Sequence, residues 1–135
     1  MDDAAEQRNG LASRLDSARP AQARAAAWDV LDLAERLADA VTWLPHADPV
    51  AAMAAAQSCG DVRRSLTAPT QGSPADIPDD LGAGVVECAE LLGRLASLLD
   101  APGGEHLQPD PQARQAAAAH VRASHQALTN ALRLS

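Results

Sequence analysis

Residues 30–44, VLDLAERLADAVTWL, decide the fold of this chain. Their apolar side chains recur every three or four residues, the spacing that gathers them on one side of an α-helix. The members of this stripe are Val30, Leu33, Ala34, Leu37, Val41 and Leu44. The other side carries acidic residues and Trp43. We therefore predict a long amphipathic helix near residues 20–44 that buries its apolar side against other helices.

Prolines and aspartates mark where other helices begin. Asp48-Pro49 and Asp110-Pro111 each place a capping carboxylate before a proline at the first helical position, and Asp79 or Asp80 can cap another helix. Four further helices are expected near residues 3–17, 49–67, 80–100 and 111–133. Residues 68–79 are rich in proline and are expected to form a mobile loop.

The core residues favour helices over a sheet. The larger apolar residues are mostly leucines and alanine is abundant, whereas β-branched and aromatic residues, which normally pack a sheet, are few. We predict one all-α domain over residues 1–135, an up-and-down four-helix bundle with an additional short N-terminal helix. Pro20 either separates that N-terminal helix from the 20–44 helix or kinks one long helix.

Charge and composition limit the partners. The net charge is −7, Phe and Tyr are absent, and direct DNA binding is not expected because phosphates are repelled and few aromatic rings can stack on bases. No apolar run approaches the roughly 18 residues of a membrane-spanning helix. The acidic start of the chain is unlike a secretory signal, so a cytoplasmic location is expected. Basic residues that are all arginine, with much Ala, Gly and Pro, suggest a GC-rich bacterial genome.

The two tryptophans lie outside the apolar stripe of the 20–44 helix. They are 15 residues apart, about 22 Å along a helix axis. Either the N-terminal helix covers them with Leu11 and Leu15, or they anchor a surface for a protein partner or a second copy, since tryptophan is enriched at interface hot spots. The residues of this candidate interaction surface are Trp28, Asp32, Asp39 and Trp43.

Neither a metal nor a cofactor is expected. The carboxylates of the 20–44 helix (Asp29, Asp32, Glu35 and Asp39) are expected on a solvated face, and no Glu-x-x-His pair of a di-metal bundle is present. The four histidines are expected to be structural or at the surface. Cys59 and Cys88 fit no metal or redox spacing, and we expect buried thiols.

One pattern suggests an enzyme. Arg114 and His120 are separated by five residues on the last predicted helix. This spacing resembles the Arg-(four to six residues)-His motif of the HEPN class of small all-helical ribonucleases, in which the motif cleaves RNA, usually across a homodimer interface. The residue after Arg114 is Gln115, where that family often has Asn. The resemblance implies catalytic roles for Arg114 and His120.

Three functions remain open at this point. The main prediction is a small non-catalytic protein for protein–protein interaction or regulation that associates with itself, as a homodimer, or with a protein partner. The first alternative is the HEPN-like ribonuclease. The second is a bundle that binds a small apolar ligand between alanine-lined helices, which requires an internal cavity.

Overall fold

The computed structural model describes residues 10–16, 19–45, 47–66, 80–101 and 104–131. Within these ranges there are helices and no strand, so the predicted all-α class is confirmed. The long helices are α2 (Pro20–Thr42), α3 (Pro49–Ser65), α4 (Leu81–Asp100) and α5 (Pro111–Ala131), with a short 3-10 helix, η1 (Gly104–His106), between α4 and α5. A further helical segment covers residues 10–15.

The helices begin where the prolines and aspartates predict. Asp48 accepts hydrogen bonds from the backbone N–H groups of Val50 and Ala51, at 3.0 and 3.2 Å. Asp80 accepts one from Ala83 at 3.1 Å, so Asp80 caps α4. Asp110 accepts one from Ala113 at 3.3 Å. The predicted loop at 68–79 lies outside the described residues.

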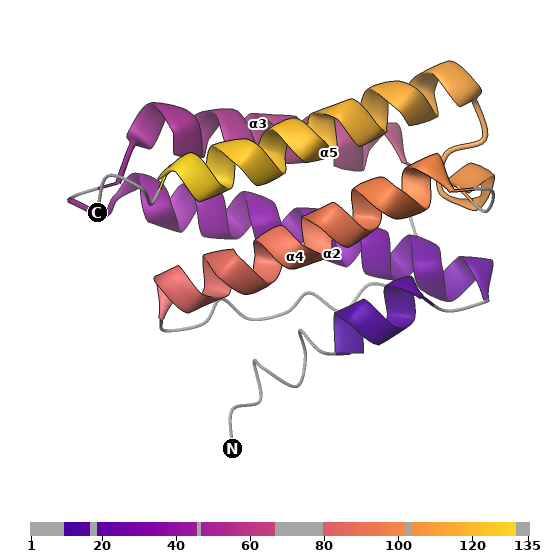
Figure 1. Cartoon of the computed structure of the whole chain (residues 1–135), viewed down its shortest axis with the longest axis horizontal. Coiled ribbons are helices and arrows are strands. Elements are labelled where there is room, and N and C mark those ends of the chain that lie inside the picture. Colours follow the sequence, from indigo (N-terminus) through magenta and orange to yellow (C-terminus); the bar gives the residue numbers. More distant parts are fainter. Residues whose placement is uncertain (1–9, 17–18, 46, 67–79, 102–103, 132–135) are drawn as a thin grey trace.

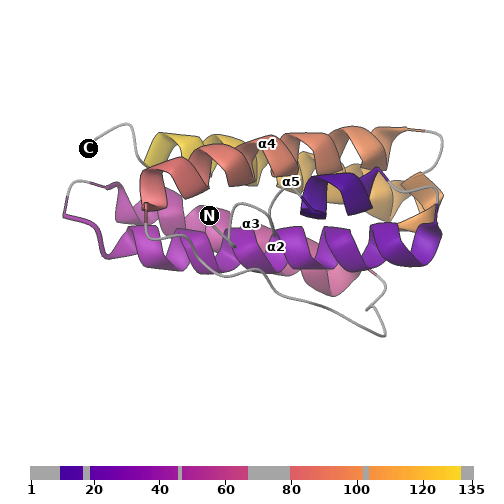
Figure 2. The same cartoon turned by 90° about the horizontal axis from the view of Figure 1, so that it is seen from below.

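Each long helix contacts two others along its length: α2 packs on α3 and α4, and α5 packs on the same two helices. α2 and α5 run in one direction and α3 and α4 in the other, so α2 ends at the end of the molecule where α3 and α4 begin and α5 finishes (Figures 1 and 2). The predicted up-and-down order is therefore wrong between α3 and α4, because α4 runs parallel to α3 instead of reversing its direction. The backbone N–H of Asp48 donates to the carbonyl of Ala131 at 2.9 Å, which joins the start of α3 to the finish of α5.

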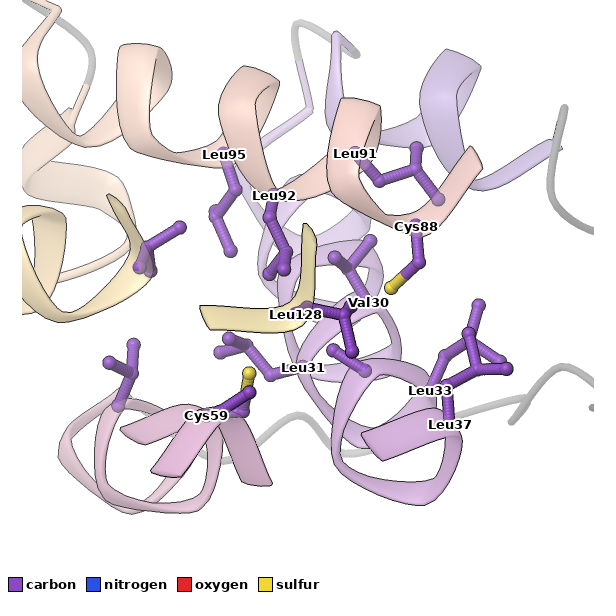
Figure 3. Packing of buried hydrophobic residues seen from close by; sticks show 14 of the residues in the cluster. Val30, Leu31, Leu33, Leu37, Cys59, Cys88, Leu91, Leu92, Leu95 and Leu128 are labelled. Atoms are coloured by element: carbon purple, nitrogen blue, oxygen red, sulfur yellow. The ribbon is translucent and has the colours of Figure 1, made fainter. Parts of the chain in front are cut away.

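Leucines from α2, α4 and α5 meet in the centre of the molecule. Figure 3 shows Val30, Leu31, Leu92 and Leu128 pointing toward one another from these three helices. Each of the four is at most 1% exposed. Among the remaining buried residues alanine is the most frequent, followed by leucine, and the small alanine side chains let the helices approach closely.

The N-terminal helical segment is a separate element. Arg19 is extended and Pro20 is the first residue of α2, so the helix begins at this proline and does not run through it. Residues 10–15 lie beside α2 and α4 and run opposite to α2 (Figures 1 and 2). Leu11 and Leu15 are buried, at 0% and 2% exposure. Burying two leucines stabilises by about 1.5–3 kcal/mol each, which is similar in size to the cost of ordering the segment, about 1 kcal/mol per residue.

Adding a methyl group at two glycines of this fold should change the free energy of unfolding in opposite directions. A Cβ on Gly104 would lie 2.4 Å from the carbonyl oxygen of Leu99 and 2.9 Å from that of Leu98. On Gly93, inside α4, it would meet nothing within 4 Å. We expect Gly104→Ala to lower the free energy of unfolding by about 1–3 kcal/mol and Gly93→Ala to raise it by about 0.5–1 kcal/mol. Urea denaturation of both variants measures this, and equal signs would contradict the placement of η1 against α4.

Candidate interaction surface

The four residues predicted for the interaction surface differ in exposure. All four lie on the side of α2 away from its buried stripe. Trp28 and Asp32 are half-buried, whereas Asp39 and Trp43 are exposed. Asp32 accepts a hydrogen bond from Arg36 Nε at 3.0 Å on the same helix. The structure therefore divides the predicted surface into a half-buried part in the middle of α2 and an open part at its end.

Trp28 is covered by α3. The guanidinium carbon of Arg63 lies 5.4 Å from the centre of the indole ring, within range of a cation–π interaction. Glu35 holds the same guanidinium, since Arg63 Nη2 donates to Glu35 Oε2 at 2.8 Å. The Nε atom of Arg63 is buried and has no hydrogen-bond partner within the described part of the chain. Trp28 therefore belongs to the α2–α3 contact.

Replacing Arg63 should loosen this contact. We expect Arg63→Ala to expose the Trp28 ring and to lower the free energy of unfolding by about 0.5–1 kcal/mol, the size of a partly exposed cation–π pair. A Trp43→Ser background leaves Trp28 as the reporter, and its fluorescence should become more accessible to acrylamide. Unchanged quenching would contradict the pairing. Arg64→Ala, one residue further on, is the matched control because Arg64 pairs with Asp61.

Trp43 is covered much less than Trp28 by the described residues. It caps the C-terminus of α2, its N–H donates to the Ala40 carbonyl at 3.3 Å, and 81% of it is exposed. The interpretation in which the N-terminal helix covers both indoles with Leu11 and Leu15 is therefore wrong for Trp43. Those leucines are buried beside α2 and α4 instead.

Other large apolar side chains are exposed at the same end of the molecule. They are Val50 at 74%, Met53 at 61% and Val86 at 60%. Val50 and Met53 lie in the first two turns of α3, and Val86 is the sixth residue of α4. Both helices begin where α2 ends (Figure 1). We call Trp43, Val50, Met53 and Val86 the apolar end.

The other three members of the apolar end were not predicted from the sequence. A signal was nevertheless present in the 49–67 helix, because its buried positions are occupied by the smaller Ala52 and Ala55. Val50 and Met53 therefore face outward on the same helix. An inverted pattern, with larger apolar residues outside and alanines inside, indicates an exposed apolar face.

One carboxylate departs from the expected solvated face. Asp29 is 1% exposed and pairs with Arg14 of the N-terminal segment, 3.3 Å from Nη1 to Oδ2. The expectation of an exposed carboxylate was wrong here, because the N-terminal segment packs over this part of α2. Glu35 pairs with Arg63, and Asp39 is exposed. No group of three or more His, Cys, Asp or Glu residues with metal-site geometry occurs among the described residues.

Arg114 and His120 lie in different surroundings. Arg114 Nη1 donates to the carbonyl of Gln108 at 3.0 Å, which ties the start of α5 to the preceding connection. His120 is exposed. Six residues on a helix turn the chain through one and two-thirds turns, so the two side chains leave α5 on different sides. Within one chain these residues do not converge on a common point.

Both cysteines are buried, as expected from the sequence. The pKa of the Cys59 thiol is raised to about 11, chiefly by burial. A hydrogen bond with Ser124 of α5 acts to lower this pKa, and the charge of Glu35 acts to raise it. A thiol with this pKa is almost wholly protonated near neutral pH and is a poor nucleophile. Cys59 therefore serves the packing of α3 against α5.

The chain matches no protein-family model, no curated protein and no solved structure. No helix in the described ranges is both long and apolar enough to cross a bilayer. Function is therefore inferred from the geometry of the molecule.

Proposed function

We propose that this protein is a small non-catalytic interaction module, a four-helix bundle with a fifth N-terminal helix, that self-associates through its apolar end. Trp43 is the principal anchor of the contact. Asp39 lies on its rim, and the half-buried Trp28 and Asp32 support the α2 surface behind it. A homodimer in the bacterial cytoplasm is the simplest form of this proposal.

The observation that carries the proposal is the 81% exposure of Trp43 at the end of the molecule where α3 and α4, which carry the other exposed large apolar residues, begin. A solvent-exposed indole gains free energy when a partner covers it, and tryptophans are frequent interface hot spots. The end of a helical protein is also suited to a two-fold contact, because the same patch on a second copy can pack against it.

Removing the anchor tests the proposal. We expect Trp43→Ser to weaken self-association by about tenfold or more, the loss typical of a hot-spot residue. Sedimentation velocity over a concentration series measures the change. Gln115→Ala, an exposed change near the other end of the molecule, is the control and should leave association unchanged. A wild-type protein that is monomeric at every concentration would contradict self-association.

The salt dependence of binding distinguishes self-association from the binding of a basic partner. Each copy brings a net charge of −7 and an exposed Asp39 to the contact, so like charges oppose association. Self-association should therefore strengthen when salt is added, and Asp39→Asn should strengthen it at low salt. If both changes instead weaken the binding of a partner protein, the acidic rim attracts a basic partner.

The two alternatives remain predictions with simple tests. The ribonuclease interpretation requires that the protein degrade RNA and that His120→Ala abolish the cleavage. The ligand interpretation requires an apolar compound to raise the melting temperature of the protein.

A further inference from the structure

The apolar end includes a methionine side chain that solvent reaches. Met53 is the fifth residue of α3 and is 61% exposed. Val50, one turn earlier on the same helix, is also exposed. Both side chains lie on the outer side of α3, because Ala52 and Ala55 occupy its buried side. The thioether of Met53 is therefore part of the surface that a second copy covers in the proposed contact.

The other sulfur atoms in the described part of the chain are protected. They belong to Cys59 and Cys88, which are 1% and 0% exposed. The pKa of the Cys59 thiol is raised to about 11, chiefly by burial, so little of the reactive thiolate is present near neutral pH. Met1 lies outside the described residues. Of the three described sulfur-containing side chains, Met53 is the one that a dissolved oxidant reaches in the folded protein.

Oxidation of a thioether by hydrogen peroxide is a balanced two-electron step. The sulfur lone pair attacks one peroxide oxygen, so that a sulfur–oxygen bond forms as the oxygen–oxygen bond breaks. The departing hydroxide takes the proton from the transferred oxygen and leaves as water. The product is methionine sulfoxide, a polar group in place of an apolar one. Two thiols reverse the step, since they are oxidised to a disulfide while the sulfoxide oxygen leaves as water.

We propose that Met53 is an oxidation site that regulates the apolar end, where the thioether favours the contact and the sulfoxide formed by a peroxide opposes it. This inference rests on the proposed self-association. A sulfoxide oxygen that a second copy covers loses its bound water, and Val50 and Val86 of the same surface offer no side-chain donor in exchange. A second copy that covers Met53 also shields it, so associated protein is oxidised more slowly.

Treatment of the full chain with hydrogen peroxide tests this inference. Mass spectrometry of the peptide that contains Met53 follows the addition of one oxygen atom. We expect complete oxidation to weaken self-association by about tenfold, the effect of a polar group buried without a partner. Sedimentation velocity before and after treatment measures the change. Methionine sulfoxide reductase with a thiol reductant should restore the original association.

Met53→Leu is the matched control, because leucine is apolar and similar in size but takes up no oxygen. This variant should associate like wild type and should not respond to peroxide. It keeps Met1, Trp43 and both cysteines, so a response that persists in it would place the effect elsewhere and overturn the inference. Oxidised wild type that associates as strongly as untreated protein would overturn the inference alone. Untreated protein that is monomeric at every concentration would instead remove the apolar end as a contact, and this inference with it.

Discussion

Leu128→Ala is expected to lower the free energy of unfolding by about 3 kcal/mol, within the usual range for truncating a buried leucine. Leu128 is 1% exposed. The other buried residues of α5 are Ala117, Ala118, Val121, Ser124 and Ala131. Most of these are small, so Leu128 provides much of the apolar area that holds α5 to its neighbours. The cavity left by truncation lies among Val30, Leu31 and Leu92 (Figure 3).

Leu98 is the matched control for this change. It also lies in a long helix, α4, but is only half-buried. Leu98→Ala removes the same atoms and should cost less than half as much, because water can fill part of the space. Urea denaturation measures both values. Equal losses, or a loss below about 1 kcal/mol for Leu128→Ala, would contradict the central position of Leu128.

Stability should fall when the pH rises from 9 to about 11. The pKa of the Cys59 thiol is raised from 9.0 to about 11 in the folded protein, chiefly by burial. The folded state therefore holds this proton where the unfolded state has released it. The contribution is fully present below pH 9 and is lost as the pH rises through the folded pKa. Two pH units correspond to an upper value of about 2–3 kcal/mol.

The composition makes this alkaline experiment unusually simple. The chain contains neither Tyr nor Lys, so no phenol or amine side chain titrates in the range where Cys59 loses its proton. Denaturation at pH 8 and pH 11 should show the loss in wild type, and Cys59→Ala should reduce it. Cys88→Ala is the matched control, because it leaves Cys59 in place. A wild-type stability independent of pH over this range would show that Cys59 is not buried as described.

Helix positions could be predicted from the sequence because their signals are local. Asp48-Pro49 and Asp110-Pro111 fix the starts of α3 and α5, and the apolar stripe of residues 30–44 identifies the buried side of α2. For α2 the stripe is wider than predicted, since Leu31 and Ala38 are also buried. The additional width arises because α2 packs on both α3 and α4.

The environments of individual side chains depend on distant parts of the chain and could not be predicted. Trp28 is half-buried because Arg63, 35 residues away in sequence, lies over its ring. Asp29 is buried because Arg14 reaches it from the N-terminal segment. Both residues occupy the polar side of α2, and helical periodicity alone assigns them to solvent. Trp43 lies beyond both contacts and is exposed.

The fluorescence of Trp43 alone tests the central proposal most directly. A Trp28→Phe variant keeps an aromatic ring beneath Arg63 and leaves Trp43 as the single indole. In dilute solution its emission should resemble that of free tryptophan, and it should shift to the blue as the concentration rises and a second copy covers the ring. Emission that stays unshifted at every concentration would contradict self-association through the apolar end.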